Sequence, residues 1–99
     1  MFEIGNRIIC VDSSIKPEAL EETLRDVPNF VVKGNKYTVR GFNENGGIVL
    51  GVLLEEIRNP ILFFKLLGYS QESSFATFRF RLLENDKVNV EELEEIAVL

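Results

Sequence analysis

KYTVRGF, residues 36–42, alternates polar and apolar side chains over its first five positions. A period of two is typical of a β-strand that packs one face on a core and leaves the other face in water. The pattern predicts that Tyr37 and Val39 point inward. The predicted outward-facing residues are Lys36, Thr38 and Arg40. The stretch therefore predicts a sheet with one buried and one solvated face.

A second apolar run lies shortly after this strand. Residues 43–47, NENGG, are turn formers, and the run IVLGVLL, residues 48–54, follows them. Two such runs around a glycine-containing loop predict an antiparallel hairpin. Gly51 interrupts the second run, and we expect a bulge or a bend there, as a small barrel requires where a strand turns a corner.

Two further stretches, one near each end of the sequence, predict strands. RIICVD, residues 7–12, is short and rich in strand formers, and a Gly-Asn turn precedes it. FRFRLL, residues 78–83, alternates phenylalanine and arginine. Its period of two predicts one inward and one outward side. The predicted inward residues are Phe78, Phe80 and Leu82, and the predicted outward residues are Arg79, Arg81 and Leu83.

Helical patterns occur in two segments. Residues 17–27 begin with proline, carry glutamates near the positive end of the predicted helix and repeat apolar residues at helical spacing. The tail, residues 84–99, holds six acidic groups and one basic group. Asn89 suits an N-cap, so we predict an acidic amphipathic helix in the tail. Its apolar stripe comprises Val90, Leu93 and Ala97.

The segment ILFFKLLGY, residues 61–69, is apolar on nearly all sides. It is too short to span a bilayer, which takes about 20 residues. One interpretation is that an insert at residues 60–69 covers an open end of the fold and joins the core. The alternative is that its side chains are exposed and mark a protein interface. The candidate interface residues are Phe63, Phe64, Leu66 and Leu67.

Composition indicates one small domain. The 99 residues are 45% hydrophobic and 27% charged, which matches a compact fold rather than a disordered chain. Cys10 is the only cysteine and histidine is absent, which excludes an internal disulfide and the usual zinc sites. No basic-then-apolar leader opens the sequence, so we expect a cytoplasmic protein without membrane contact.

Charge is unevenly distributed along the sequence. The net charge is −3 over residues 1–32, +3 over residues 33–83 and −5 over residues 84–99. A basic face on a small barrel would suit nucleic acid. The candidate contacts are Lys36, Arg40, Arg79 and Arg81. Inward-pointing phenylalanines would leave few platforms for stacking bases, and the acidic flanks would repel phosphates, so this function ranks second.

Three of the predicted strands together resemble a known family. Gly5 to Asp12, Lys33 to Val39 and Phe75 to Leu82 are similar, in order and spacing, to stretches of short SH3-like barrel proteins. These largely uncharacterised proteins occur in bacteria, phages and other mobile elements. The resemblance covers residues 1–83 and implies about five strands, with Gly34 and Gly51 at turns and bends, but no settled activity.

Catalytic chemistry has little support in the sequence. Glu55 and Glu56 are neighbours on a strand and would point to opposite faces, so they could not bracket one bond. Cys10 has no histidine to activate it, and we expect it to be a small buried hydrophobe. We therefore assign no catalytic residue, no metal site, no cofactor and no small-molecule ligand.

Together these features predict a mainly β protein. Residues 1–83 would form a small SH3-like barrel of about five antiparallel strands with the helix at 17–27 and the insert at 60–69, and residues 84–99 a helical tail. We expect a non-catalytic binding, adaptor or accessory module that contacts another protein or a second copy of itself. Nucleic-acid binding is the alternative, and an enzyme with an unrecognised site is the second alternative.

Overall fold

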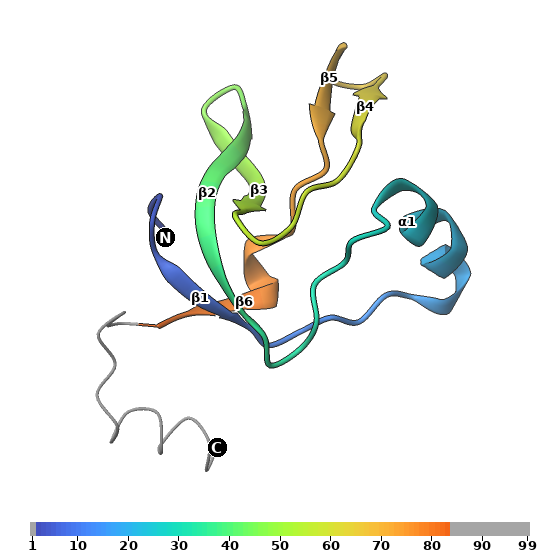
Figure 1. Ribbon diagram of the computed structural model, residues 1–99. Helices are drawn as coiled ribbons and strands as arrows, with labels where there is room; N and C mark the ends of the chain where they lie inside the picture. The colour runs from blue at the N-terminus through green and yellow to red at the C-terminus, as the bar shows by residue number, and fades with distance from the viewer. Residues whose placement is uncertain (1, 84–99) are drawn as a thin grey trace, which may run out of the picture.

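The computed structural model describes residues 2–83, which fold mainly as antiparallel β-structure (Figure 1). The elements in chain order are β1 (Arg7–Cys10), η1 (Pro17–Ala19), α1 (Leu20–Asp26), β2 (Lys36–Asn45), β3 (Ile48–Leu54), β4 (Ile61–Phe64), β5 (Tyr69–Glu72), η2 (Thr77–Arg79) and β6 (Phe80–Leu82). Strands β3, β2, β1 and β6 form one sheet in that order, while β4 and β5 form a separate two-stranded sheet. The prediction of a mainly β fold is confirmed.

The β-structure does not close into the predicted small barrel, because the two ends of the four-stranded sheet do not pair with each other. At one end, β6 is three residues long and, within the described chain, pairs with β1 alone. At the other end, a single bridge between Val52 and Phe75 extends the sheet beyond β3. Closure requires edge strands that pair over several residues, and the β4–β5 hairpin projects away from the sheet instead (Figure 1).

Strands β2 and β3 form the hairpin predicted from the alternating pattern. Tyr37 and Val39 are 4% and 1% exposed, as expected for the inward face. The turn is shorter than the predicted five-residue loop, because β2 continues to Asn45. Gly46 and Gly47 make the turn with φ values of 60° and 81°, and a tight two-residue hairpin turn of this kind requires positive φ at both positions.

Gly51 lies at a register shift in β3, which confirms the predicted irregularity. At this shift Leu50 lies opposite no residue of β2, whereas its neighbours Val49 and Gly51 pair with Glu44 and Asn43. A Cβ atom at Gly51 would lie 2.7 Å from the Phe75 carbonyl oxygen and would also clash with the Ser74 side chain. Glycine is therefore required here because the backbone that follows β5 crosses β3 at close range.

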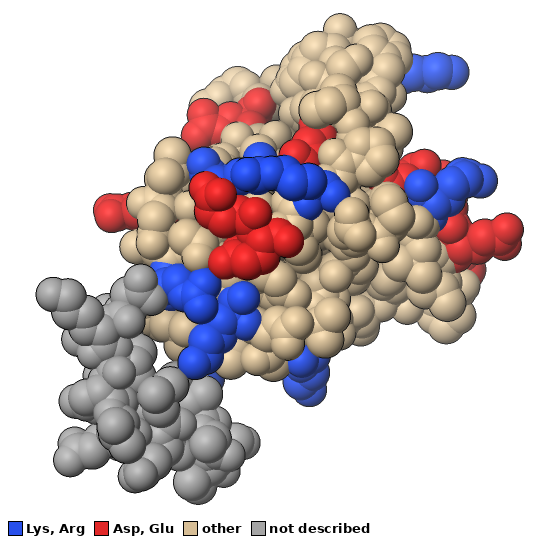
Figure 2. All heavy atoms as spheres, viewed as in Figure 1, with Lys and Arg blue, Asp and Glu red and all other residues tan. Residues whose placement is uncertain are grey.

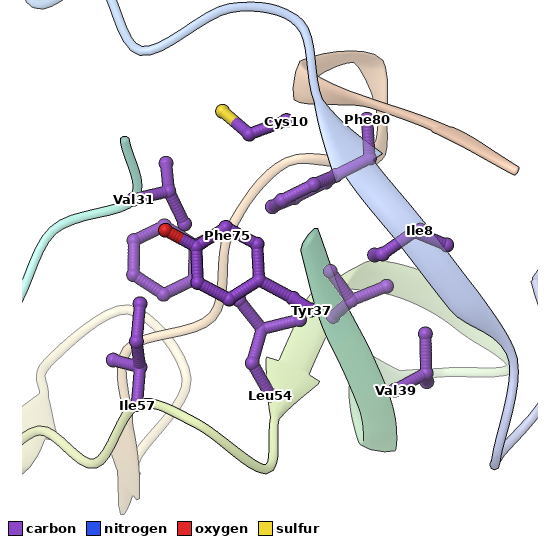
Figure 3. Packing of buried hydrophobic residues seen from close by; sticks show 10 residues of the cluster. Ile8, Cys10, Val31, Tyr37, Val39, Leu54, Ile57, Phe75 and Phe80 are labelled. Carbon is purple, nitrogen blue, oxygen red and sulfur yellow. The ribbon is translucent and has the colours of Figure 1, made fainter. Parts of the chain in front are cut away.

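The core lies between the inner face of the four-stranded sheet and the segments that follow α1, β3 and β5 (Figure 3). The Tyr37 ring packs edge-on against Phe80, with ring centroids 6.3 Å apart, and its hydroxyl accepts a hydrogen bond from the Val32 N–H at 2.9 Å. Cys10 is 1% exposed, as predicted, and burial raises the pKa of its thiol. The buried hydrophobic residues are Ile8, Cys10, Val31, Tyr37, Val39, Val52, Leu54, Ile57, Phe75 and Phe80.

The predicted strand at residues 78–83 begins two residues late, because η2 precedes it. In this 3-10 turn the Phe80 N–H donates to the Thr77 carbonyl. Phe80 points into the core and is 6% exposed, but Phe78 is 68% and Leu82 is 39% exposed, so the inward prediction is wrong for the last two. A period of two applies only to extended backbone, and the turn removes Phe78 from it.

The helix predicted at residues 17–27 is confirmed as the 3-10 turn η1 followed by α1. Leu20 and Leu24 are 46% and 42% exposed, and α1 stands to one side of the four-stranded sheet (Figure 1). Within residues 2–83 no helix has the length and apolar character needed to cross a membrane. The predicted helix at residues 84–99 lies outside the described residues.

Candidate functional site

The apolar insert at residues 60–69 forms most of the β4–β5 hairpin, which was not predicted from the sequence. β4 and β5 pair in antiparallel register over their full length. In the turn, the Phe64 carbonyl accepts hydrogen bonds from the N–H groups of Leu67 and Gly68 at 3.1 and 2.8 Å. Gly68 has a φ of 78°, and this glycine before a polar stretch is the local signal that indicates a turn.

The two sides of this hairpin differ in exposure. Ile61 and Phe63 are 66% and 62% exposed, and Leu66 in the turn is 101% exposed; we call these three residues the exposed apolar strip. Phe64 and Leu67 are instead half-buried and line a groove. The predicted interface is thus divided between two surfaces. Ile61 was missed, although strand alternation places it on the same side as Phe63.

An ion pair fixes the base of the hairpin to the four-stranded sheet. Arg40 Nη2 lies 2.6 and 2.7 Å from the two carboxylate oxygens of Glu72 in β5. The two side chains are only 17% and 12% exposed. Arg40 Nε also donates to the Leu54 carbonyl at 2.7 Å, and Glu72 Oε2 accepts the Asn59 N–H at 3.0 Å. These hydrogen bonds offset the cost of removing both charges from water.

Two further contacts join the hairpin to the neighbouring β2–β3 hairpin. Asn43 Nδ2 donates to the Glu72 carbonyl at 2.6 Å, and Asn43 is only 8% exposed. Nearer the turn, the Tyr69 hydroxyl donates to the Glu44 carbonyl at 3.1 Å. Polar groups therefore hold the β5 side of the hairpin against the β2–β3 hairpin, and the exposed apolar strip has no part in this attachment.

A groove of about 850 Å³ lies between the hairpin, α1 and η2. Phe64 and Leu67 contribute from the hairpin, Val27 from the end of α1, and Phe30 and Phe75 from the segments beneath. The Phe30 and Phe75 rings pack edge-on with centroids 5.4 Å apart. Polar and charged residues also line the groove, among them Asp12, Lys16 and Gln71, so its lining is mixed rather than mainly apolar.

Arg79 lines this groove and is held by contacts within the chain. Its Nη1 donates to the carbonyls of Asp12 and Ser14 at 3.2 and 2.8 Å. The guanidinium carbon lies 5.1 Å from the centre of the Phe30 ring and 5.4 Å from that of Phe78. The side chain is 17% exposed. The sequence-based prediction of Arg79 as an outward-facing cation is therefore wrong, because the η2 turn directs it into the protein.

The four basic residues predicted to contact nucleic acid do not form one exposed face. Arg40 and Arg79 are bound within the chain, whereas Lys36 and Arg81 are exposed. Lys36 and Arg81 both pair in register with Ile9 of β1, which places them on the same outward side of the sheet. In Figure 2, basic and acidic groups lie next to each other on the visible surface, without one continuous basic area.

The neighbouring acids Glu55 and Glu56 contact different partners. Glu56 accepts hydrogen bonds from the Thr38 N–H and hydroxyl at 2.7 and 2.9 Å, and from Arg7 Nη1 at 3.1 Å. Burial raises the pKa of Glu56, but the bonds from Thr38 and the charge of Arg7 outweigh it, so the pKa is lowered overall. Glu55 pairs with Arg58 at 3.4 Å. The outward face of the sheet thus carries paired charges.

Neither a metal site nor a relative identifies the chemistry of this protein. Within the described residues, no three side chains of the metal-ligating types gather closely enough to hold an ion. When the chain is compared with protein-family models, with curated proteins and with solved structures, none of the three comparisons gives a match. The exposed apolar strip stands apart from the core cluster.

Proposed function

We propose that this protein is a non-catalytic binding module that contacts another protein, or a second copy of itself, through the exposed apolar strip. The main observation in support is that Phe63 and Leu66 are 62% and 101% exposed. They lie on a hairpin that is held by a largely buried ion pair. Full burial of a large apolar side chain is worth about 1.5–3 kcal/mol. A protein surface that covers the strip would gain part of that free energy on binding. The Arg40–Glu72 ion pair would hold the hairpin, and with it the strip, in position for binding.

The proposal includes a relation to the SH3-like barrel proteins of bacteria, phages and mobile elements. Its support is that the three similar stretches contribute to β1, β2 and β6, which are adjacent in the four-stranded sheet. The helix, the hairpin and the acidic tail are additions to that pattern. A binding function in an accessory protein would reside in these additions, which distinguish this chain from the others.

Nucleic-acid binding has weaker support than protein binding. Two cations, Lys36 and Arg81, are exposed on one side of the sheet, and phosphate contacts by these two alone would give weak affinity. Phe78 is exposed and could stack a base, but it belongs to the groove rather than to that side. Measurable binding to DNA or RNA at about 50 mM salt, weakening steeply with added salt, would reverse this order.

Site-specific photo-crosslinking in the native cells tests the protein-binding proposal. A benzoyl-phenylalanine at position 63 should give a discrete adduct, either with another protein or at twice the mass of the chain. The matched control places the same group at Ile48, which is 67% exposed on β3, outside the strip. An adduct from position 63 and none from position 48 supports the proposal. No adduct from either position, or the same adducts from both, contradicts it.

A further inference from the structure

Among residues 2–83, the outer edge of β4 is an unpaired strand edge. β4 pairs with β5 on one side, and among residues 2–83 no other backbone hydrogen bond reaches Ile61, Leu62 or Phe63. Figure 1 shows β5 on the side toward the β2–β3 hairpin and β4 on the side away from it. The space beside β4 is a hollow lined by residues 62–67 and by Asp26 of α1. A further strand would therefore meet free backbone groups there.

The other open edges of the protein are better protected against strand pairing than the edge of β4. β6 is three residues long and presents Arg81. β3 is bridged to Phe75 and interrupted at Gly51. Edge strands are usually protected by charges, bulges or short length. β4 has the sequence ILFF, without a charge or a bulge, and Pro60 before it limits pairing to these residues.

We propose that β4 pairs with β4 of a second copy of this chain, antiparallel across a two-fold axis at Leu62. This inference rests on the proposed function and names its partner. Pairing of like with like in a sheet keeps each side chain on its own face, so residues opposite each other must be an even number apart. An axis at Leu62 places Ile61 opposite Phe63 of the second copy, and Phe63 opposite its Ile61. The two exposed apolar strips then form one continuous surface.

The charged residues near the β4 edge support the axis at Leu62, and they also support a second copy of the chain as the partner at this edge. Moving the axis to Phe63 would set Ile61 opposite Lys65, which would place an ammonium group against an apolar side chain. With the axis at Leu62, Lys65 falls beyond the paired residues. The charged groups that line the hollow beside this edge are Lys65 and Asp26, one of each sign in each copy. Two chains of net charge −5 therefore meet here without an excess of like charge.

The area available predicts a weak association. At their exposures, the three side chains of the strip offer on the order of 100 Å² each, since a whole aromatic side chain buries about 150–250 Å². Pairing through the strand edge covers only part of this area, because Ile61 and Phe63 stay on the outer face beside those of the second copy and Leu66 lies beyond the paired residues. The buried area is therefore well below the ~1,200 Å² lower limit of a standard interface. Strand pairing adds backbone hydrogen bonds to this area. We expect a dimer with a Kd on the order of 100 µM.

Sedimentation equilibrium of the full chain with single and mixed variants tests the pairing. Ile61→Glu alone and Phe63→Lys alone should each weaken association at least tenfold, because each homodimer opposes a charge to an apolar residue twice. A 1:1 mixture should associate again, because the mixed dimer has one Glu–Lys pair and one native Ile–Phe pair. The recovered association should weaken with salt. Circular dichroism of each variant checks the fold, which both exposed positions should leave intact.

The control mixture and the negative outcomes separate this inference from the proposed function. Ile61→Glu mixed with Phe63→Glu should not recover association, because the mixed dimer then opposes two carboxylates. Loss of association in both single variants without recovery in the mixture overturns the Leu62 register. A wild type that stays monomeric up to about 1 mM overturns the second copy as partner. In that case a crosslinked adduct from position 63 to a different protein would still uphold the proposed function.

Discussion

The β2–β3 hairpin and the β4–β5 hairpin each contain an apolar run, and the two runs differ in how much of them is buried. The apolar runs IVLGVLL and ILFFKLL differ little in composition. Val52 in β3 is 0% exposed, whereas Phe63 in β4 is 62% exposed. The two hairpins differ in what adjoins them. The first is extended by β1 and β6 and covered by Phe75, whereas the second has no third strand among residues 2–83. Burial of an apolar strand thus depends on its neighbours.

The two hairpins are also held by different forces. The first contributes Tyr37, Val39, Val52 and Leu54 to the hydrophobic core. A two-stranded hairpin alone is marginally stable in water, so the second needs an attachment. Its attachment is polar and lies at its base, where Arg40 and Glu72 form their ion pair. Ile61, Phe63 and Leu66 of the second hairpin are consequently left for other contacts.

Removing one phenylalanine from each region should give the largest contrast. Phe80 is 6% exposed in the core and Phe63 is 62% exposed on the hairpin. Phe80→Ala should lower the free energy of unfolding by about 3–5 kcal/mol, because it leaves a cavity in the core. Phe63→Ala should change it by less than about 0.5 kcal/mol. Urea denaturation of both variants measures the difference, and equal effects would abolish the distinction between the two hairpins.

Breaking the ion pair should loosen the second hairpin more than the first. Arg40→Met leaves the Glu72 carboxylate largely buried without its cation, which should cost about 3 kcal/mol. Hydrogen exchange should accelerate in residues 61–72 more than in β1 and β2. Adding Glu72→Gln to Arg40→Met should recover part of the loss, because the amide is uncharged and still accepts the Asn59 N–H. A uniform acceleration of hydrogen exchange over both sheets would mean that the ion pair stabilises the whole fold and not the second hairpin in particular.

The smallest expected effect concerns the charges on the outward face of the first hairpin. The pKa of Glu56 is lowered in the folded protein, so its carboxylate adds stability above its ordinary pKa of 4.5. This contribution should disappear as the pH falls through the lowered pKa. Because the Glu56 side chain is 37% exposed, Glu56→Gln should cost less than about 1 kcal/mol at pH 7.

Thermal unfolding of Glu56→Gln beside the wild type between pH 3 and 7 measures this dependence. The two proteins should differ most at neutral pH and converge at acid pH. Thr38→Val, which removes one of the two Thr38 donors, is the matched control and should reduce the pH dependence. A wild type that gains stability relative to the variant as the pH falls would have the opposite sign and would contradict the assigned contacts.

Local patterns in the sequence predicted the elements that local physics decides. The alternation in residues 36–42 identified the inward side chains of β2, and the Gly-Gly pair marked its turn. The proline and spacing at residues 17–27 identified the helix. Gly51 was correctly expected to interrupt β3, but the reason, contact with the backbone near Phe75, is distant in sequence. No local pattern contains that contact.

The incorrect predictions share one cause. The inward direction of Phe78 assumed that the strand period begins at residue 78, and η2 delays it to Phe80. The outward direction of Arg79 failed for the same reason. The predicted basic face is wrong because Arg40 pairs with the carboxylate of Glu72, which lies 32 residues further along the chain. Each error concerns a partner or a backbone path that period and composition do not specify.

The sequence by itself determined which segments are extended, where the chain turns and that Cys10 is buried, because backbone preference and the spacing of apolar residues act over a few neighbours. Only the tertiary structure decided that the sheet stays open, that two of four predicted cations are occupied and that Ile61, Phe63 and Leu66 face solvent. These outcomes depend on which distant segments meet. Apolar residues show the same pattern whether another strand covers them or water does.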